Sequence, residues 1–141
     1  EYAIEILKEY FPKKRIIDLD LKKNDKIPYE GILHLDCTFN PIGKDKCIIY
    51  KNGFVDQNDY ELIIDIFGEE NCFHVTDEEM FEMNPNIFSI SPEVVVSDHT
   101  FTRMNKHLRD VWGFTVEEIP YREVSKMGGL LRCSTMPLVR E

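Results

Sequence analysis

Apolar residues recur at helical spacing at the start of the chain. One face of a predicted helix over residues 1–11 carries Ala3, Ile6, Leu7, Tyr10 and Phe11. Pro12 ends this pattern because it lacks a backbone donor. Residues 15–21 then alternate loosely between apolar and polar side chains, which is the period of a strand. The chain is therefore predicted to open with a helix followed by a strand.

A longer pattern begins after Gly31. Apolar runs predict strands over residues 32–39 and 47–50, and apolar residues at helical spacing predict a helix over residues 58–67. Gly68 is typical of a helix C-terminus, and residues 72–75 supply a further strand. The order is strand, strand, helix, strand.

The same order returns further along the chain. Strands are predicted over residues 87–91, 94–96 and 115–119, with a helix over residues 102–112 between the last two. A short helical turn with the Thr76 capping box separates the two sets. Such self-similarity is the signature of a repeat architecture, so we expect an α/β protein with two full strand-strand-helix-strand units.

Both ends of the chain look like parts of the same unit. Residues 1–21 resemble the helix and last strand of a preceding unit, and residues 130–139 resemble the first strand of a following one. Repeat arrays bury their terminal faces with neighbours or caps. We therefore expect residues 1–141 to be the C-terminal portion of a single domain about twice as long, with no internal domain boundary.

Composition narrows the class of partner. The chain has 141 residues, of which 43% are hydrophobic and 30% charged, and its formal charge is −9. This excess of acidic side chains repels nucleic acid and anionic lipid, so neither is an expected partner. The apolar runs also fall far short of the roughly 20 residues that a membrane span needs.

Four cysteines lack the paired spacing of a metal or redox motif: Cys37, Cys47, Cys72 and Cys133. No charged and then apolar signal segment precedes them. We therefore expect reduced thiols in a cytoplasmic protein.

His34 and Asp36 stand two residues apart on the predicted strand over residues 32–39, so both side chains leave the same face. An imidazole shuttles protons, and a carboxylate next to it can hold a cation. A histidine on a strand is more often a structural residue, so this pair alone is a weak signal.

Cys133 provides the second candidate. Gly128 and Gly129 allow a tight turn into the strand predicted to start near this residue. A free cysteine is usually a small buried hydrophobe, whereas a nearby histidine would make it a nucleophile. Spacing alone does not establish that His34 lies near it.

Three segments together resemble a known family. They are HLDCTFNPIG at residues 34–43, MNPNIFSISPEVVVSD at 83–98 and GGLLRCSTMPLVR at 128–140. They look like the guanidine-modifying, or pentein, superfamily, which includes arginine deiminases, dimethylarginine dimethylaminohydrolases and glycine amidinotransferases. The similarity is greatest to bacterial amidinotransferases and citrulline-utilisation hydrolases, and it extends over about residues 15–140.

The resemblance implies a fold and a mechanism. The fold is a five-bladed α/β-propeller of ββαβ units, of which this chain would hold about two full and two partial blades. Cys133 would attack the guanidinium carbon to form a thiouronium, and His34 would protonate the leaving amine and then activate water or an acceptor amine. Asp36 would hold the guanidinium nitrogens, and the loop with Asn86 would approach the substrate. No metal or other cofactor is implied.

The chain departs from the family in one respect. Family members use a further acidic guanidinium ligand on an earlier blade, which these residues lack, so we expect the N-terminal half of the domain or a second chain to complete the pocket. Hydrolysis and amidino transfer share the first covalent step, and the resemblance favours hydrolysis slightly. The alternative is a non-catalytic binding or assembly module in which Cys133 is an inert core thiol.

Other reactive side chains have simpler interpretations. Cys37 is expected to be a core thiol facing away from His34, and Arg132 is expected to form a structural salt bridge away from the face of Cys133. Three more histidines are interpreted as strand, loop and helix-surface residues: His74, His99 and His107.

Overall fold

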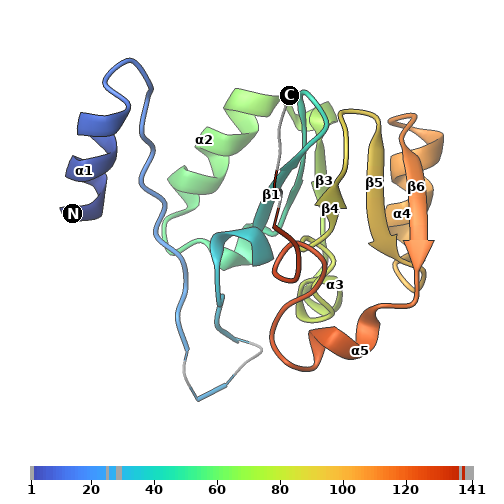
Figure 1. Ribbon diagram of the computed structural model, residues 1–141. Helices are drawn as coiled ribbons and strands as arrows, with labels where there is room; N and C mark the ends of the chain where they lie inside the picture. The colour runs from blue at the N-terminus through green and yellow to red at the C-terminus, as the bar shows by residue number, and fades with distance from the viewer. Residues whose placement is uncertain (1, 25, 28–29, 137, 139–141) are drawn as a thin grey trace.

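Two three-stranded sheets stand side by side and form the body of the molecule (Figure 1). The structure is a computed structural model that describes residues 2–24, 26–27, 30–136 and 138. The first helix, α1 (Tyr2–Tyr10), lies apart from both sheets and is joined to them by an extended segment (Figure 1). It has no buried residue.

The first sheet belongs to a ββαβ unit. Its elements are β1 (Phe39–Ile42), β2 (Lys46–Ile49), α2 (Gln57–Phe67) and β3 (Cys72–His74). β1 pairs with β2 antiparallel, and β2 pairs with β3 parallel. The side chain of Asp56 accepts a hydrogen bond from the backbone N–H of Asn58 and caps the N-terminus of α2, while Gly68 at φ 83° ends the helix.

The second sheet repeats this topology. Its unit comprises β4 (Phe88–Ser89), β5 (Val94–Asp98), α4 (Thr102–Asp110) and β6 (Thr115–Ile119). β4 pairs antiparallel with β5, and β5 pairs parallel with β6. The two full ββαβ units predicted from the sequence are therefore confirmed.

Short helices connect the larger elements. α3 (Asp77–Phe81) begins with the predicted capping box between Thr76 and Glu79, and α5 (Arg122–Ser125), which the sequence analysis did not predict, follows β6. The named 3-10 turns of the described residues are η2 (Leu35–Cys37), η3 (Lys51–Gly53) and η4 (Glu69–Asn71). Within the described part of the chain, no helix is long and apolar enough to cross a bilayer.

Two predicted strands near the N-terminus are wrong. Residues 15–21 run extended but form only an isolated bridge from Leu21 to Phe54. The strand expected over residues 32–39 begins only at Phe39, after η2. The backbone N–H of Cys37 bonds to the carbonyl of His34 at 3.1 Å, which closes a turn where a strand was expected.

The strand predicted over residues 130–139 is also wrong for the residues that the structure describes. These residues form turns, because the hydroxyl of Ser134 donates to the carbonyl of Leu130 at 2.6 Å and the hydroxyl of Thr135 donates to that of Leu131 at 2.8 Å. Local side-chain bonds of this kind compete with strand pairing. Residues 137 and 139–141 of this prediction lie outside the described residues.

Both units contribute to one hydrophobic core. Ile48 of β2, Val95 of β5 and Leu108 of α4 are completely buried in the same cluster. Gly43, in the β1–β2 turn, lies so close to the ring of Phe114 that a Cβ there would come within 2.7 Å of the ring. The two units are therefore packed against each other.

A buried carboxylate fixes the chain after β6. Asp98 has no exposed surface and accepts hydrogen bonds from the Thr100 N–H (2.8 Å), the Thr100 hydroxyl (2.6 Å) and the Tyr121 N–H (2.6 Å). Burial alone would raise the pKa of Asp98, but these hydrogen bonds outweigh it and hold that pKa below its ordinary value.

His107 differs from its interpretation as a helix-surface residue. Its ring is partly buried and packs against Phe73 and Trp112, at centroid distances of 5.0 and 4.7 Å. Burial, aided by the nearby charge of Arg103, lowers the pKa of His107. This histidine is a neutral packing residue between the two units.

Candidate active site

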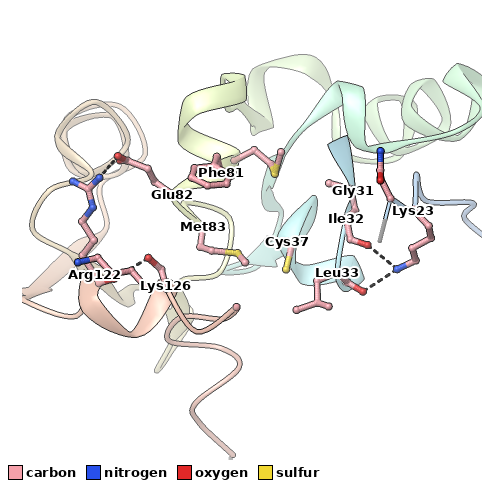
Figure 2. Close-up of a pocket in the computed structure, with 14 residues that line it drawn as sticks. Lys23, Gly31, Ile32, Leu33, Cys37, Phe81, Glu82, Met83, Arg122 and Lys126 are labelled. Carbon is pink, nitrogen blue, oxygen red and sulfur yellow. Dashed lines mark hydrogen bonds and ion pairs between the residues drawn. The ribbon is translucent and has the colours of Figure 1, made fainter. Parts of the chain in front are cut away.

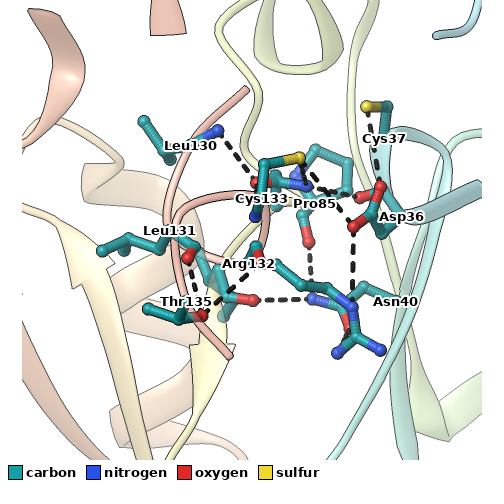
Figure 3. Close-up of polar contacts among 11 residues, drawn as sticks. Asp36, Cys37, Asn40, Pro85, Leu130, Leu131, Arg132, Cys133 and Thr135 are labelled. Carbon is teal, nitrogen blue, oxygen red and sulfur yellow. Dashed lines mark hydrogen bonds and ion pairs between the residues drawn. The ribbon is translucent and has the colours of Figure 1, made fainter. Parts of the chain in front are cut away.

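His34, Asp36 and Cys133 come together between the two units, although Asp36 and Cys133 are 97 positions apart along the chain. One nitrogen of His34, one carboxylate oxygen of Asp36 and the sulfur of Cys133 all lie within 4.8 Å of one another. The Cys133 sulfur is 4.0 Å from Asp36 Oδ2 (Figure 3). His34 and Cys133 are exposed and Asp36 is half-buried.

Three segments meet here, and we call them the junction: residues 34–38, 83–86 and 128–135. The first carries His34 and Asp36, and the last carries Cys133. His34 is the residue before η2, and Asp36 lies within η2. The predicted proximity of the two side chains on one strand face therefore arises from a turn. The reason is that the amides of Cys37 and Thr38 bond to the carbonyls of His34 and Leu35 in local turns instead of strand pairing.

Two glycines shape the turn that presents Cys133. Gly128 adopts φ 84°, a conformation that side chains disfavour. A Cβ on Gly129 would lie 2.9 Å from the Cys133 Cβ and 3.3 Å from its sulfur. The predicted tight turn is therefore present, and only glycine at position 129 leaves room for the cysteine side chain.

Asn86 holds the same turn from the other side. Its Oδ1 accepts hydrogen bonds from the backbone N–H groups of Leu130 (2.9 Å) and Cys133 (3.2 Å), and its Nδ2 lies 3.2 Å from the Cys133 sulfur. Asn86 has no exposed surface and lines neither of the two pockets around the junction. Its role as a substrate ligand stays a prediction. Its side chain contacts the cysteine turn and, through Nδ2 at 3.5 Å, the backbone carbonyl of Asp36.

Arg132 forms the salt bridge that was predicted, and its partner is Asp36. Arg132 Nε lies 3.6 Å from Asp36 Oδ2, and Nη1 donates to Asn40 Oδ1 at 3.2 Å (Figure 3). The carboxylate expected to bind a guanidinium thus already faces one belonging to the chain itself. Since residues 131–134 form a turn, the strand alternation that separated Arg132 from the site does not apply.

Asn40 was missed by the sequence analysis. Its Nδ2 donates to the carbonyls of Pro85 (2.7 Å) and Ile87 (2.9 Å), on either side of Asn86. It is buried completely. The repeat itself held the signal, because an Asn-Pro pair stands at residues 40–41 in the first unit and at 84–85 just before the second.

Two pockets flank the junction. The smaller has a volume of about 390 Å³ and includes two of the three candidate residues, His34 and Asp36. Its lining comprises His34, Leu35, Asp36, Phe39, Pro41 and Arg132. The larger, about 970 Å³, lies beside Cys37, Met83 and the segment after α5 (Figure 2). Its rim includes the ion pair between Arg122 and Glu82 (Figure 2).

The four thiols fall into two groups. Cys37, Cys47 and Cys72 are buried and Cys133 is exposed, and all four are free. Burial and the Asp36 charge raise the pKa of Cys37 to about 11, partly offset by a backbone hydrogen bond, which confirms a protonated core thiol. The alternative in which Cys133 is an inert core thiol is inconsistent with its exposed side chain.

The same three side chains are also of types that bind transition metals. Imidazole, carboxylate and thiolate each offer one ligand atom here, whereas a closed structural zinc site takes four. A thiol, an imidazole and a carboxylate are also the side-chain types that can supply a nucleophile, an acid–base group and an anionic anchor. His34 and Asp36 line the smaller pocket, and Cys133 lies within 4.8 Å of both. A planar cation is the ligand that such a carboxylate binds best.

Comparison with known proteins identifies relatives. The sequence model of the family described as arginine deiminase matches residues 53–140, more than half of the chain, which includes Asn86 and Cys133 but not His34 or Asp36. The uncharacterized protein YkgA of Bacillus subtilis (strain 168) is 30% identical over 138 residues, which cover 98% of this chain and 44% of that protein.

Solved structures give the same result for the fold. The N-terminal domain of ArgZ, an arginine dihydrolase from cyanobacteria, superposes with a TM-score of 0.80 at 19% identity, covering 99% of this chain and 48% of that one. SxtG, an amidinotransferase from Microseira wollei, superposes with a TM-score of 0.70 at 20% identity, covering 99% and 39%. The predicted pentein-type architecture is confirmed, and the chain spans just under half the length of these relatives.

Proposed function

Because this chain belongs to the arginine deiminase family, we propose that it carries the reacting side chains of an enzyme that modifies guanidino groups through a covalent cysteine intermediate. The observation that supports this most is the grouping of His34, Asp36 and Cys133 within 4.8 Å of one another, with His34 and Asp36 lining an open pocket. The N-terminal domain of ArgZ has also been crystallised covalently bonded to a reaction intermediate.

The proposed first step is attack of the Cys133 sulfur on the guanidinium carbon. A carbon–sulfur bond forms, and His34 donates a proton to the nitrogen that leaves, so that the carbon–nitrogen bond breaks and a neutral amine or ammonia departs. The Asp36 carboxylate binds the guanidinium nitrogens and balances their charge. A positive substrate next to the thiol favours the reactive thiolate.

The second step decides the reaction type. His34, now deprotonated, removes a proton from water or from an acceptor amine, which attacks the thiouronium carbon and releases Cys133. Water gives hydrolysis and an amine gives amidino transfer. The family match favours hydrolysis. Amidino transfer is the second candidate, because SxtG, which has the same fold, is an amidinotransferase.

The smaller pocket, which His34 and Asp36 line, is open. We propose that a further part of the same domain, or a second chain, covers it and supplies the remaining acidic ligand. The relatives are about twice as long as this chain, and the exposed face of α1 offers a surface for such a part, with Tyr2 81% and Tyr10 76% exposed. Full activity is therefore expected from the complete protein only.

The test is product analysis of the complete protein. Arginine, citrulline and methylated arginines are incubated with it, with and without glycine, and the products are identified by mass spectrometry. Ammonia or an amine released without glycine indicates hydrolysis, whereas glycine-dependent guanidinoacetate indicates transfer. His34→Ala should abolish turnover in either case, and a fully active His34→Ala protein would refute the proposed mechanism.

A covalent probe provides an independent test of the nucleophile. A chloroacetamidine compound carries a planar cation for Asp36 and an electrophilic carbon for Cys133, so it should label Cys133 alone. Labelling confined to Cys37 or Cys72 would contradict the assignment. Peptide mapping of the labelled protein distinguishes these outcomes.

A further inference from the structure

The side chain of Asn86 makes three hydrogen-bond contacts with the turn that carries Cys133. We propose that Asn86 is a positioning residue that donates a hydrogen bond to the Cys133 thiolate while its oxygen fixes the turn that carries the sulfur. The inference rests on the proposed function in one respect only, that Cys133 is the nucleophile.

The orientation of the Asn86 amide follows from its partners. The backbone N–H groups of Leu130 and Cys133 can only donate, so the side-chain atom that faces them, 2.9 and 3.2 Å away, has to be the oxygen. The NH2 group then faces the Cys133 sulfur, 3.2 Å away, and also the backbone carbonyl oxygen of Asp36, 3.5 Å away. Because an NH2 group is a donor only, and a thiolate accepts more strongly than a thiol, this contact favours the ionised nucleophile.

The amide is also held rigidly in place. Asn86 has no exposed surface, and its backbone carbonyl accepts from the Arg132 N–H at 3.1 Å. Asn40 fixes the carbonyls of Pro85 and Ile87, the two neighbours of Asn86. A donor that is fixed before the reaction needs no reorganisation when the thiolate forms, which is the condition for effective electrostatic stabilisation.

A purely structural role is the competing explanation. In that case Asn86 caps the turn through its oxygen, and its nitrogen is a bystander. The two explanations differ in the ionisation of Cys133, which a turn cap alone leaves unchanged. The pH dependence of thiol alkylation therefore separates them.

The experiment measures the rate of alkylation of Cys133 by iodoacetamide as a function of pH, on this chain and on Asn86→Ala. The other three cysteines are buried, and Cys133→Ser gives the background. We expect the midpoint of the rate profile to rise by about 1 pH unit in Asn86→Ala, because a hydrogen bond to the charged form is lost. If the midpoint in Asn86→Ala equals that of the wild-type protein, the inference is overturned.

Asn105→Ala is the matched control. Asn105 is also a completely buried asparagine with two side-chain hydrogen bonds, to Ser97 and to the carbonyl of Asp98, but it lies on α4 away from the thiol. It should lower thermal stability and leave the alkylation midpoint unchanged. A shift of equal size in Asn105→Ala would attribute the effect to general loosening and overturn the inference.

A second variant covers the possibility that Asn86→Ala does not fold. Asn86→Asp keeps an acceptor for both backbone N–H groups and replaces the donor next to the sulfur with a carboxylate oxygen. Its midpoint should rise by more than that of Asn86→Ala, and an unchanged midpoint would overturn the inference. Alkylation requires no substrate, so a shifted midpoint in a protein that converts no guanidino compound would reject the proposed function while supporting this inference.

Discussion

The interior of each ββαβ unit and the junction between the units use different kinds of hydrogen bond. Inside the units, backbone amides pair along strands and helices, as between β5 and β6. At the junction, the side chains of Asn40 and Asn86 hold backbone groups of segments that pair with no strand. The hydrogen bonds inside the units therefore do not depend on particular side chains, whereas those at the junction depend on single residues.

If this contrast is correct, substitutions in the two regions should separate activity from stability. Changes to the exposed Cys133 and to the turn that presents it should reduce reactivity more than they reduce the free energy of unfolding. Changes inside the units should reduce the free energy of unfolding without altering the reactivity of the folded protein.

The largest effect is expected at the junction from Cys133→Ser. Turnover in the complete protein should fall by at least about 10³-fold, because a serine hydroxyl is a far weaker nucleophile than a thiolate. The side chain is exposed, so the free energy of unfolding measured by urea denaturation should change by less than about 0.5 kcal/mol. Retained turnover would show that the nucleophile lies elsewhere.

Inside the first unit, Ile48→Ala should give the largest loss of stability. Ile48 is completely buried in β2, so the substitution removes apolar contacts and leaves a cavity, at a cost of about 3 to 4 kcal/mol. Urea denaturation measures this change. The alkylation rate of Cys133 in the folded variant should match the wild type, and a tenfold change in that rate would show that the two regions are not separable.

Gly129→Ala should displace the nucleophile without unfolding the chain. The added methyl would meet the Cys133 Cβ at 2.9 Å, so the turn has to shift. A displacement of this order reduces turnover by about 10²-fold. Gly113→Ala is the control, since Gly113 also has a positive φ of 73° but no atom within 4 Å, and it should lower stability while turnover stays unchanged.

The smallest of these effects is expected from Asp98→Asn, and it should depend on pH. The variant loses charge-assisted hydrogen bonds, so near neutral pH it should be less stable by about 2 kcal/mol. Because the folded pKa of Asp98 is lowered, its stabilisation is present above the ordinary aspartate pKa and is lost as the pH falls through the folded value. The difference in unfolding free energy between wild type and variant should therefore shrink below about pH 4, and a constant difference would contradict this assignment.

The same contrast explains which features could be predicted from the sequence. Hydrophobic periodicity depends on burial of one face, so the order of elements in both units and the end of α2 at Gly68 were predicted correctly. Two bounds were wrong, because β1 spans Phe39–Ile42 where residues 32–39 were predicted, and α4 ends at Asp110, before the predicted Trp112. Family resemblance, and not periodicity, singled out His34, Asp36 and Cys133 together. The strand predictions failed at Leu35–Cys37 and after Leu130, where local turn bonds to carbonyls replace strand pairing.

Roles that depend on distant partners could not be predicted from the sequence. Nothing in the spacing of residues 40, 86 and 132 indicates that Asn40 supports the neighbours of Asn86 or that Arg132 faces Asp36. The contact between Asn40 and Pro85 joins segments 45 residues apart, and that between Cys133 and Asp36 joins segments 97 residues apart. A single sequence contains no direct signal for such pairs.

That separation also has a consequence for the order of folding. The contacts between Arg132 and Asn40 and between Cys133 and Asp36 close loops of 92 and 97 residues, whereas the hairpin and parallel pairs inside each unit are local. Closing a long loop costs conformational entropy that only contacts already formed can offset. We therefore expect the two units to form first and the grouping of His34, Asp36 and Cys133 to form late, after both of them.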